Sequence, residues 1–211
     1  MPSTTIAEHA APTRRLTAKG EATRARIVEA ASALVFLHGV TRTGVEDVQR
    51  EAGVSASQLY HYFGDKQTLM RAVIAHQTVE VLAAQGPELD ALDSFEALDR
   101  WRDGLVALQR ARHCAGGCPI GSIAAEIAED DPDARADLVD SFEQWEAPLR
   151  SGLATMRDRG ALRKDADTDR LALALLAALQ GGLVLTQLRR TTLPLETAID
   201  ASLELIRSYR A

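Results

Sequence analysis

The sequence predicts an all-α protein, and three observations support that prediction. Hydrophobic residues make up 46% of the chain and aromatic residues only 4%, and the apolar set is rich in Ala and Leu, which favour helices over strands. Apolar residues recur at spacings of three and four along most of the chain, the period of an amphipathic helix. No segment alternates apolar and polar residues in the manner of a half-buried strand. At 211 residues, the chain can hold one large domain or a small domain joined to a larger one.

Three helices are expected near the N-terminus. The first runs from about Thr17 to Gly39, where glycine ends an apolar stripe. Two short helices follow, each opened by a capping box in which an N-cap side chain and a Glu or Gln three positions later satisfy backbone N–H groups. The two boxes pair Thr43 with Glu46 and Ser55 with Gln58. Gly64 and Asp65 then separate the third helix from a longer amphipathic helix.

Five further helices are expected beyond Gly86-Pro87. Their approximate bounds are Ser94–His113, Cys118–Ile127, Asp131–Gly160, Asp169–Thr191 and Pro194–Tyr209. Pro119 and Pro132 suit first helical positions. Pro148 lies inside a helix and is expected to kink it.

Charge is unevenly distributed along the chain. Residues 1–71 contain 9 Lys and Arg against 7 Asp and Glu, whereas residues 72–211 contain 15 against 23. The net charge of −6 therefore originates in the C-terminal part. A slightly basic N-terminal part joined to an acidic remainder suits nucleic-acid binding at one end only. Residues 1–16 are expected to form a disordered, weakly basic arm.

The segment TGVEDVQREAGVSASQLYHYF, residues 43–63, has the strongest functional signal. Two short helices joined by a tight glycine turn cannot bury their apolar faces alone, so they pack against a preceding helix. This is the arrangement of a helix-turn-helix unit, whose second helix enters the DNA major groove. An ordinary helical hairpin with solvated polar residues is the alternative. The coincidence of two capping boxes, a glycine turn and an aromatic-rich second helix argues against it.

Polar residues of this unit indicate which side chains meet DNA. Short donors and acceptors on the second helix can contact base edges, and a glutamine can bind adenine through two hydrogen bonds. Hydroxyl and ring donors, together with helix N-termini, suit phosphate contacts. The candidate DNA-contacting residues are Thr41, Arg42, Thr43, Ser55, Ala56, Ser57, Gln58, Tyr60, His61, Tyr62 and Lys66.

Residues 21–76 resemble the TetR family of bacterial regulators, through a helix ending at His38-Gly39 and the segment EDVQREAGVSASQLYHYFGDKQTLMRAVIAH. The resemblance implies a dimer of nine-helix subunits, each with a DNA-binding head, residues 17–65, and a ligand-binding and dimerisation body, residues 66–211. The positions that correspond to DNA-backbone contacts are Thr43, Ser57, Tyr60, Tyr62 and Lys66. The positions where the family reads bases are Ser55, Ala56, Gln58 and His61. Many members have Lys or Gly near Ala56-Ser57, which leaves the operator sequence open.

The C-terminal part resembles the branch of that family typified by the LmrA and YxaF multidrug-linked repressors, through GCPIGSIAAE and QGGLVL. The family resemblance implies a cavity for a small apolar ligand, for which aromatic and thioether side chains make adaptable walls. Each such side chain, taken singly, is explained more simply as core. The candidate lining residues are Met70, Ile74, Gln77, Trp101, Leu105, Cys118, Trp145, Leu149, Met156 and Gln180.

The last two expected helices have more apolar surface than one subunit needs to bury. A four-helix contact between two subunits uses such surface, and Gly181-Gly182 would let a partner helix approach closely. Burial within one subunit is the alternative. The candidate dimer-interface residues are Leu175, Leu179, Gly182, Leu183, Ile199, Leu203 and Ile206.

His113, Cys114 and Cys118 place three potential metal ligands within six residues. Zinc requires a fourth ligand, and no other His or Cys lies nearby in the sequence, so no metal or other cofactor is expected. Redox sensing through a disulfide is a second alternative, although cytosolic thiols are normally reduced. Packing of both cysteines as small buried side chains is the preferred interpretation.

Together these patterns predict a homodimeric repressor that leaves a palindromic DNA operator when a small apolar molecule binds. A DNA-binding adaptor whose body engages a protein partner is the alternative; an enclosed apolar cavity favours the first reading and an exposed apolar patch the second. The sequence contains no phosphate loop, nucleophile elbow or HExxH pattern, so no enzyme is expected. With no apolar leader, and with the apolar run Leu171–Leu185 shorter than a bilayer span, a cytoplasmic location without membrane contact is expected.

Overall fold

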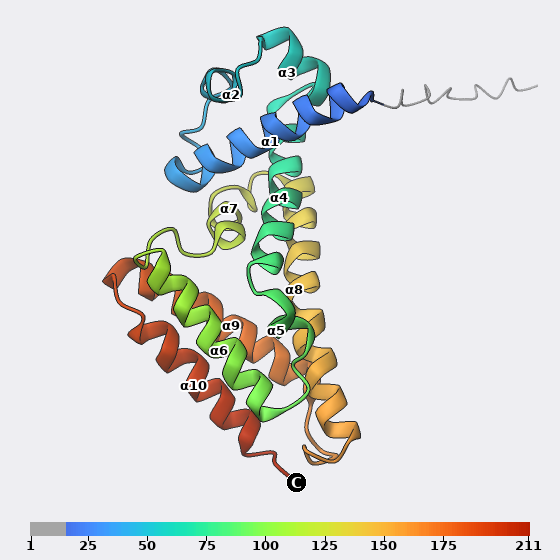
Figure 1. Ribbon diagram of the computed structural model, residues 1–211, viewed down its shortest axis with the longest axis vertical. Coiled ribbons are helices and arrows are strands. Elements are labelled where there is room, and N and C mark those ends of the chain that lie inside the picture. Colours follow the sequence, from blue (N-terminus) through green and yellow to red (C-terminus); the bar gives the residue numbers. More distant parts are fainter. Residues whose placement is uncertain (1–15) are drawn as a thin grey trace, which may run out of the picture.

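The computed structural model describes residues 16–211, and these residues form an all-α fold, which confirms the predicted class (Figure 1). The helices are α1 Ala18–His38, α2 Val45–Ala52, α3 Ala56–Phe63, α4 Lys66–Ala83, α5 Gly86–Asp90, α6 Phe95–Ala111, α7 Pro119–Ile127, α8 Pro132–Asp158, α9 Thr168–Arg189 and α10 Leu193–Arg207. The described part thus has one helix more than the nine expected, because Gly86–Asp90 forms the short α5. The expected N-terminal arm, except Leu16, lies outside the described residues.

Helices α1, α2 and α3 form a small unit at one end of the molecule, which we call the head (Figure 1). Helix α2 has Gly44 as its N-cap, and the Gly44 backbone N–H donates to the Asp47 carboxylate at 3.2 Å. The expected capping box of Thr43 with Glu46 is therefore wrong by one residue. The physical reason is that the Thr43 hydroxyl is used elsewhere, since it donates to the Gly39 carbonyl at 2.7 Å and closes the turn after α1.

Helix α3 begins with the capping box that the sequence predicts. The Gln58 backbone N–H donates to Ser55 Oγ at 3.2 Å, and the Ser55 backbone N–H donates to Gln58 Oε1 at 3.0 Å. Gly53, with φ of 62°, supplies the left-handed turn between α2 and α3, a conformation that a side chain disfavours. Leu59 and Phe63 are buried against the head core, so the opposite face of α3 is left open to solvent.

Helix α4 leaves the head and continues into the larger unit formed by α5 to α10, which we call the body (Figure 1). It packs along α8, where the buried Thr78 hydroxyl lies 2.8 Å from Ser141 Oγ and the Arg71 guanidinium pairs with Asp137 at 2.6 Å. Helix α8 continues through Pro148. Head and body are thus joined by one continuous helix.

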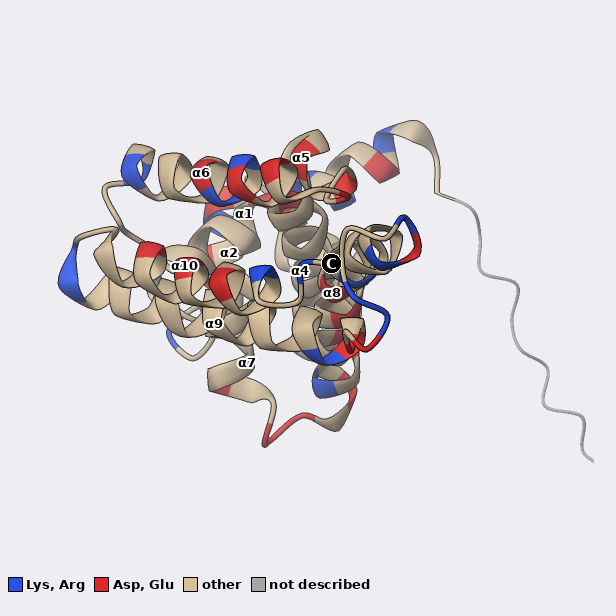
Figure 2. Ribbon diagram, turned by 90° about the horizontal axis from the view of Figure 1, so that it is seen from below, with Lys and Arg blue, Asp and Glu red and all other residues tan. Residues whose placement is uncertain are grey.

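Helix α9 packs on α8 and, along much of its length, on α10. A Cβ at Gly182 would lie 3.0 Å from Leu195 Cα, so this glycine is what allows α10 to approach. Among the described helices, only α9 is long and apolar enough to cross a membrane by composition. Figure 2 shows α9 as a largely uncharged ribbon beside the mixed charges of α10 and α6. Its contacts with α8 and α10 explain that composition as a core helix.

The residues predicted to contact a partner subunit are instead interior side chains of one subunit. This correction covers Leu175, Leu179, Gly182, Leu183, Ile199, Leu203 and Ile206, all of which are buried. The reason is that a helix turns about 100° per residue, so a stripe shifted by one or two residues faces a different direction. A Cβ at Gly181, unlike one at Gly182, would meet open space. The apolar residues of α9 that reach solvent are Leu173, Val184, Leu185 and Leu188.

Candidate DNA-binding and ligand-binding sites

The exposed face of α3 presents short polar and aromatic side chains. Tyr60 is 50% exposed, and its neighbour His61 is also exposed and lies edge-on to Tyr62, with ring centroids 5.1 Å apart. Tyr62 is half-buried, and its hydroxyl points towards Gly20 at the start of α1. The residues of this helix and its cap that reach solvent are Ser55, Ala56, Ser57, Gln58, Tyr60 and His61. An exposed helical face with this chemistry suits the DNA major groove.

The Gln58 side chain takes part in the capping box at the start of α3, before any DNA is bound. Its Oε1 accepts from the Ser55 backbone N–H at 3.0 Å and lies 3.3 Å from Ser55 Oγ. Two-point binding of adenine needs both the amide oxygen and the amide nitrogen. With the oxygen already used, Gln58 keeps its amide N–H groups as donors for one base acceptor.

Four of the residues predicted to contact DNA lie around the turn between α1 and α2, and they differ in their exposure and in their hydrogen bonds. Thr43 is buried, and its hydroxyl donates to Gly39, so it is not a contact available to DNA. Thr41 is exposed, but its backbone N–H and its hydroxyl both donate to Glu126 of the body. Arg42 is exposed, with its Nε donating to the His38 carbonyl at 3.1 Å. Lys66 Nζ donates to the Val40 carbonyl at 3.3 Å, which holds this half-buried amine at the start of α4.

The body contacts the head through the C-terminal end of α7. Glu126 accepts hydrogen bonds from the Thr41 backbone N–H at 3.0 Å and from the Thr41 hydroxyl at 3.1 Å. Partial burial alone would raise the pKa of this carboxyl, but hydrogen bonds from the Thr41 and Val40 backbone outweigh burial and the pKa is lowered. Gly39 lies beneath the carboxylate, and a Cβ there, at φ of 82°, would come within 2.6 Å of Glu126 Oε1. Glu126 is therefore ionised at neutral pH and holds the turn that precedes α2.

The body contains a cavity of about 110 Å³ between α4, α6 and the start of α7, which we call the Gln109 cavity. Its apolar wall includes Val81, Leu105, Leu108, Trp145 and Leu183. Its polar lining consists of Gln77, Glu80, Gln85, Gln109 and Arg112. A second cavity, of about 150 Å³, adjoins it and shares Ala84, Gln85, Leu105 and Leu108 with it.

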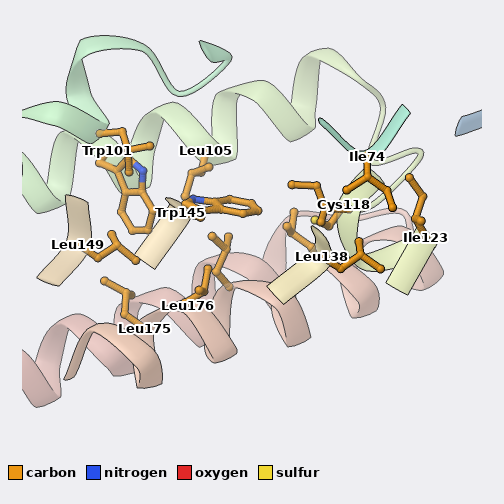
Figure 3. Close-up of a cluster of buried hydrophobic side chains, with 14 of the residues drawn as sticks. Ile74, Trp101, Leu105, Cys118, Ile123, Leu138, Trp145, Leu149, Leu175 and Leu176 are labelled. Atoms are coloured by element: carbon orange, nitrogen blue, oxygen red, sulfur yellow. The ribbon is translucent and has the colours of Figure 1, made fainter. Parts of the chain in front are cut away.

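A buried glutamine holds the two tryptophans of the chain in place. Gln85 Oε1 accepts from the indole N–H of Trp101 and from that of Trp145, each at 3.0 Å. Its Nε2 donates to the Val81 carbonyl at 2.9 Å. Buried polar groups stabilise a protein only when their hydrogen bonds are satisfied. This three-residue network fixes the position of the Trp145 ring in the cavity wall, where Figure 3 shows it beside Leu105.

The predicted pocket residues divide into three groups. The first group lines the Gln109 cavity and consists of Gln77, Leu105, Cys118 and Trp145. Trp101 lines the adjoining cavity, while Gln180 lines a separate open groove between α7, α8 and α9. The third group consists of Met70, Ile74, Leu149 and Met156, which are buried core side chains. For these four the prediction is corrected, because each is packed against other core residues.

The two cysteines are both buried and not joined to each other. Burial raises the pKa of the Cys118 thiol, and hydrogen bonding from Gly121 and Ile120 only partly offsets that rise, so Cys118 is a neutral thiol at neutral pH. Its Sγ accepts from the Gly121 backbone N–H at 3.3 Å and caps α7. Within residues 16–211, no cluster of three or more His, Cys, Asp or Glu side chains could hold a metal ion.

Sequence reasoning missed three residues that organise these sites, namely Gln85, Gln109 and Glu126. Gln85, in the turn between α4 and α5, and Glu126, on α7, act through partners from distant parts of the chain, whereas Gln109 of α6 lies buried in the cavity wall. Glu126 meets Thr41 across 85 positions, and Gln85 meets Trp145 across 60. For Gln85 the available signal was a glutamine directly after the apolar residues Leu82, Ala83 and Ala84, a position where burial requires a hydrogen-bond partner.

Comparisons with known proteins agree with this geometry. Residues 27–73 match the family described as bacterial regulatory proteins, tetR family. Residues 94–202, more than half of the chain, match the family described as tetracyclin repressor-like, C-terminal domain. The first match covers the head and the second covers most of the body.

Curated relatives are transcriptional regulators, not enzymes. The transcriptional repressor DhaR of Mycobacterium sp. (strain GP1) is 23% identical over 86% of this chain and 90% of its own length. The regulator TtgR of Pseudomonas putida is 27% identical over 80% of this chain and 81% of its own. YxaF of Bacillus subtilis, from the branch that the body resembles, is 26% identical over 85% of this chain and 92% of its own.

Solved structures share the fold. A TetR-family regulator from Cytophaga hutchinsonii superposes with a TM-score of 0.78 at 16% identity, covering 93% of this chain and 99% of its own. A TetR regulator from Chloroflexus aurantiacus gives 0.73 at 26% identity, covering 92% and 98%. With the head, the body and the relatives in agreement, the chain belongs to the TetR family of bacterial DNA-binding transcriptional regulators.

Proposed function

We propose that this protein is a cytoplasmic, homodimeric repressor that is released from a palindromic operator when a small molecule binds in the body. The observation that supports it best is the position of α7. This helix begins beside Cys118 and Pro119 in the wall of the Gln109 cavity and ends at Glu126, which holds the head. A ligand that moves the cavity wall therefore has a short, direct route to the orientation of the head.

In the proposed complex, the outer face of α3 lies in the major groove of DNA. Base edges would be read by Ser55, Ala56, Gln58 and His61, and phosphates would be bound by Arg42, Ser57, Tyr60, Tyr62 and Lys66. Because Thr43 is buried and Thr41 is held by Glu126, these two residues are left out of the proposed interface.

Dimerisation is proposed to use the apolar face of α9 and α10 that one subunit leaves uncovered. Leu188 is 73% exposed and Leu193 62% exposed, and large apolar side chains exposed together on neighbouring helices favour an interface. The proposed contact residues are Leu173, Val184, Leu185 and Leu188 of α9 with Leu193 and Leu205 of α10. A two-fold axis that runs along the length of the subunit beside this face would place two α3 helices on the same side of the dimer.

A second candidate function is an adaptor that binds a protein partner through its body. The observation that favours it is an open apolar groove of about 400 Å³ between α7, α8 and α9. Leu138, Phe142 and Leu176 line this groove together with the exposed Val139 and Leu173. The two functions differ in what releases DNA, since the adaptor requires a protein and the sensor only a small molecule.

The test of the proposed function is operator release by small molecules in the purified protein. DNA selected from random duplexes serves as the operator, and fluorescence anisotropy follows its dissociation. We expect wild type to release DNA with a small ligand, and Glu126→Ala to bind DNA within about threefold of wild type while losing most of that response. Glu129→Ala, an exposed acid on the loop after α7, is the matched control. Equal release by wild type and Glu126→Ala would contradict the proposed route through α7.

A further inference from the structure

The Gln109 side chain is an unusual feature of the body cavity. Gln109 is 4% exposed and lies in the cavity wall on α6. Within residues 16–211, no side-chain hydrogen bond involves its amide, and the Gln109 backbone carbonyl accepts from the Cys114 backbone N–H at 2.8 Å. The amide atoms of Gln109 open into the cavity and are not sealed in the core, so a ligand there can supply their hydrogen-bond partners.

The other polar groups of the buried wall are already occupied. Gln85 uses its oxygen for Trp101 and Trp145 and its nitrogen for Val81. Cys118 Sγ accepts from Gly121. Among the buried residues that line the cavity, Gln109 therefore has the side-chain amide that can still both donate and accept.

The rim and the size of the cavity limit the ligand further. Glu80 and Arg112 both lie at the exposed rim with opposite charges, so the lining favours an uncharged molecule over either ion. A volume of about 110 Å³ is slightly smaller than the roughly 150 Å³ that holds a benzene ring in an engineered cavity. The adjoining cavity extends the space past Leu105 and Leu108. The ligand is thus about the size of a single ring.

We propose that the Gln109 cavity binds a small, uncharged, hydroxyl-bearing hydrocarbon of about the size of phenol, recognised by the Gln109 amide. An amide has an acceptor oxygen and donor N–H groups, and a hydroxyl can both donate and accept, so the two groups match in both directions. A ketone can only accept, and a carboxylate would lose hydration in the apolar cavity without the neutral Gln109 amide compensating its charge. The hydrocarbon part packs on Leu105, Leu108 and the Trp145 ring. This inference names the ligand class for the proposed repressor and rests on that function.

Isothermal titration of the full-length protein with phenol, toluene and benzoate tests the proposal. Toluene matches phenol in shape without the hydroxyl, and benzoate adds a charge. We expect wild type to bind phenol at least tenfold more tightly than toluene or benzoate. In Gln109→Leu the preference for phenol over toluene falls to within about threefold, whereas in Gln144→Leu, an exposed glutamine of α8, it is retained.

The possible outcomes separate the ligand class from the regulatory function. Failure of all three probes to bind wild type at millimolar concentration overturns the proposal, as does an unchanged preference in a Gln109→Leu protein with native circular dichroism. Should Gln109→Leu not fold, Gln109→Asn, which keeps the amide but shortens its reach, must lower the preference for phenol. Phenol that binds through Gln109 without releasing operator DNA supports the ligand class and contradicts the proposed repressor mechanism.

Discussion

Glu126 at the end of α7 accepts hydrogen bonds from both the backbone N–H and the hydroxyl of Thr41, at 3.0 and 3.1 Å. The two residues belong to the body and the head respectively, so this contact supplements the continuous helix α4 that joins the two units. Because Thr41 lies four residues before the start of α2, any shift of α7 acts directly on the helix-turn-helix. The contact also depends on the charge of the Glu126 carboxylate, which is lost at low pH.

The folded-state pKa of Glu126 is lowered, which fixes the sign of its pH dependence. A carboxyl with a lowered folded pKa contributes stability above its unfolded pKa and loses it as pH falls through the folded pKa. Glu126→Gln should therefore unfold more easily than wild type at pH 7, by about 1 kcal/mol for an exposed charged hydrogen bond. Urea denaturation at pH 7 and near pH 3.5 checks this. The difference between variant and wild type should shrink at the lower pH, and a constant difference would show that the charge does not matter.

Substitutions at two leucines of α9, one buried and one exposed, distinguish an effect on folding from an effect on dimerisation. Leu179 is fully buried, so Leu179→Asp places an unpaired charge in the core and should destabilise the subunit by more than about 4 kcal/mol. Leu188→Asp, on the exposed face, should instead leave a folded monomer. Sedimentation and circular dichroism distinguish the two results. A Leu188→Asp protein that remains dimeric at micromolar concentration would rule out the proposed interface on α9.

Gln58→Glu tests base reading without removing the cap of α3. A glutamate can take the same place in the capping box, but it lacks the amide N–H groups. We expect it to change the ranking of operator variants at one base pair, by about 1–3 kcal/mol. Tyr60→Phe should weaken binding to all sequences alike, as phosphate contacts do. Gln67→Glu, exposed at the start of α4, controls for the added charge. An unaltered ranking in Gln58→Glu would show that this residue does not read a base.

The cysteines are expected to be packing residues. Because burial raises the pKa of the Cys118 thiol, little of Cys118 is reactive thiolate at neutral pH. Replacing Cys114 and Cys118 together with Ala should leave operator binding within about twofold, and should lower stability by about 1–2 kcal/mol through lost burial. Operator-binding assays with and without mild oxidant check this. Oxidant-dependent release that is confined to wild type would instead identify the cysteines as a redox sensor.

The head was predictable from sequence because its signals are local. Ser55 and Gln58 cap α3 through residues three positions apart, and Gly53 supplies the turn before it. A single competing bond moved the start of α2, since Thr43 donates to Gly39 instead of capping the helix.

The body was less predictable because its apolar residues occur on more than one face of each helix. In α9, periodicity identified Leu175 and Leu179 as part of an apolar stripe, but only packing against α10 shows that this stripe is internal. The cavity raises the same difficulty, since Met156 and Leu105 are equally apolar in sequence and only Leu105 borders empty space. Long-range contacts such as Gln85 with Trp145 have no local signature.

The central claim, that this protein is a dimeric reader of palindromic DNA through α3, is tested most directly by selection of binding sites from random duplexes. The account predicts enrichment of a palindrome whose half-sites lie about one helical turn apart, or a multiple of it. It further predicts two subunits per bound duplex by sedimentation, and a changed consensus for Gln58→Glu. Enrichment of a single, non-repeated half-site by wild type, or of no sequence at all, would contradict the account.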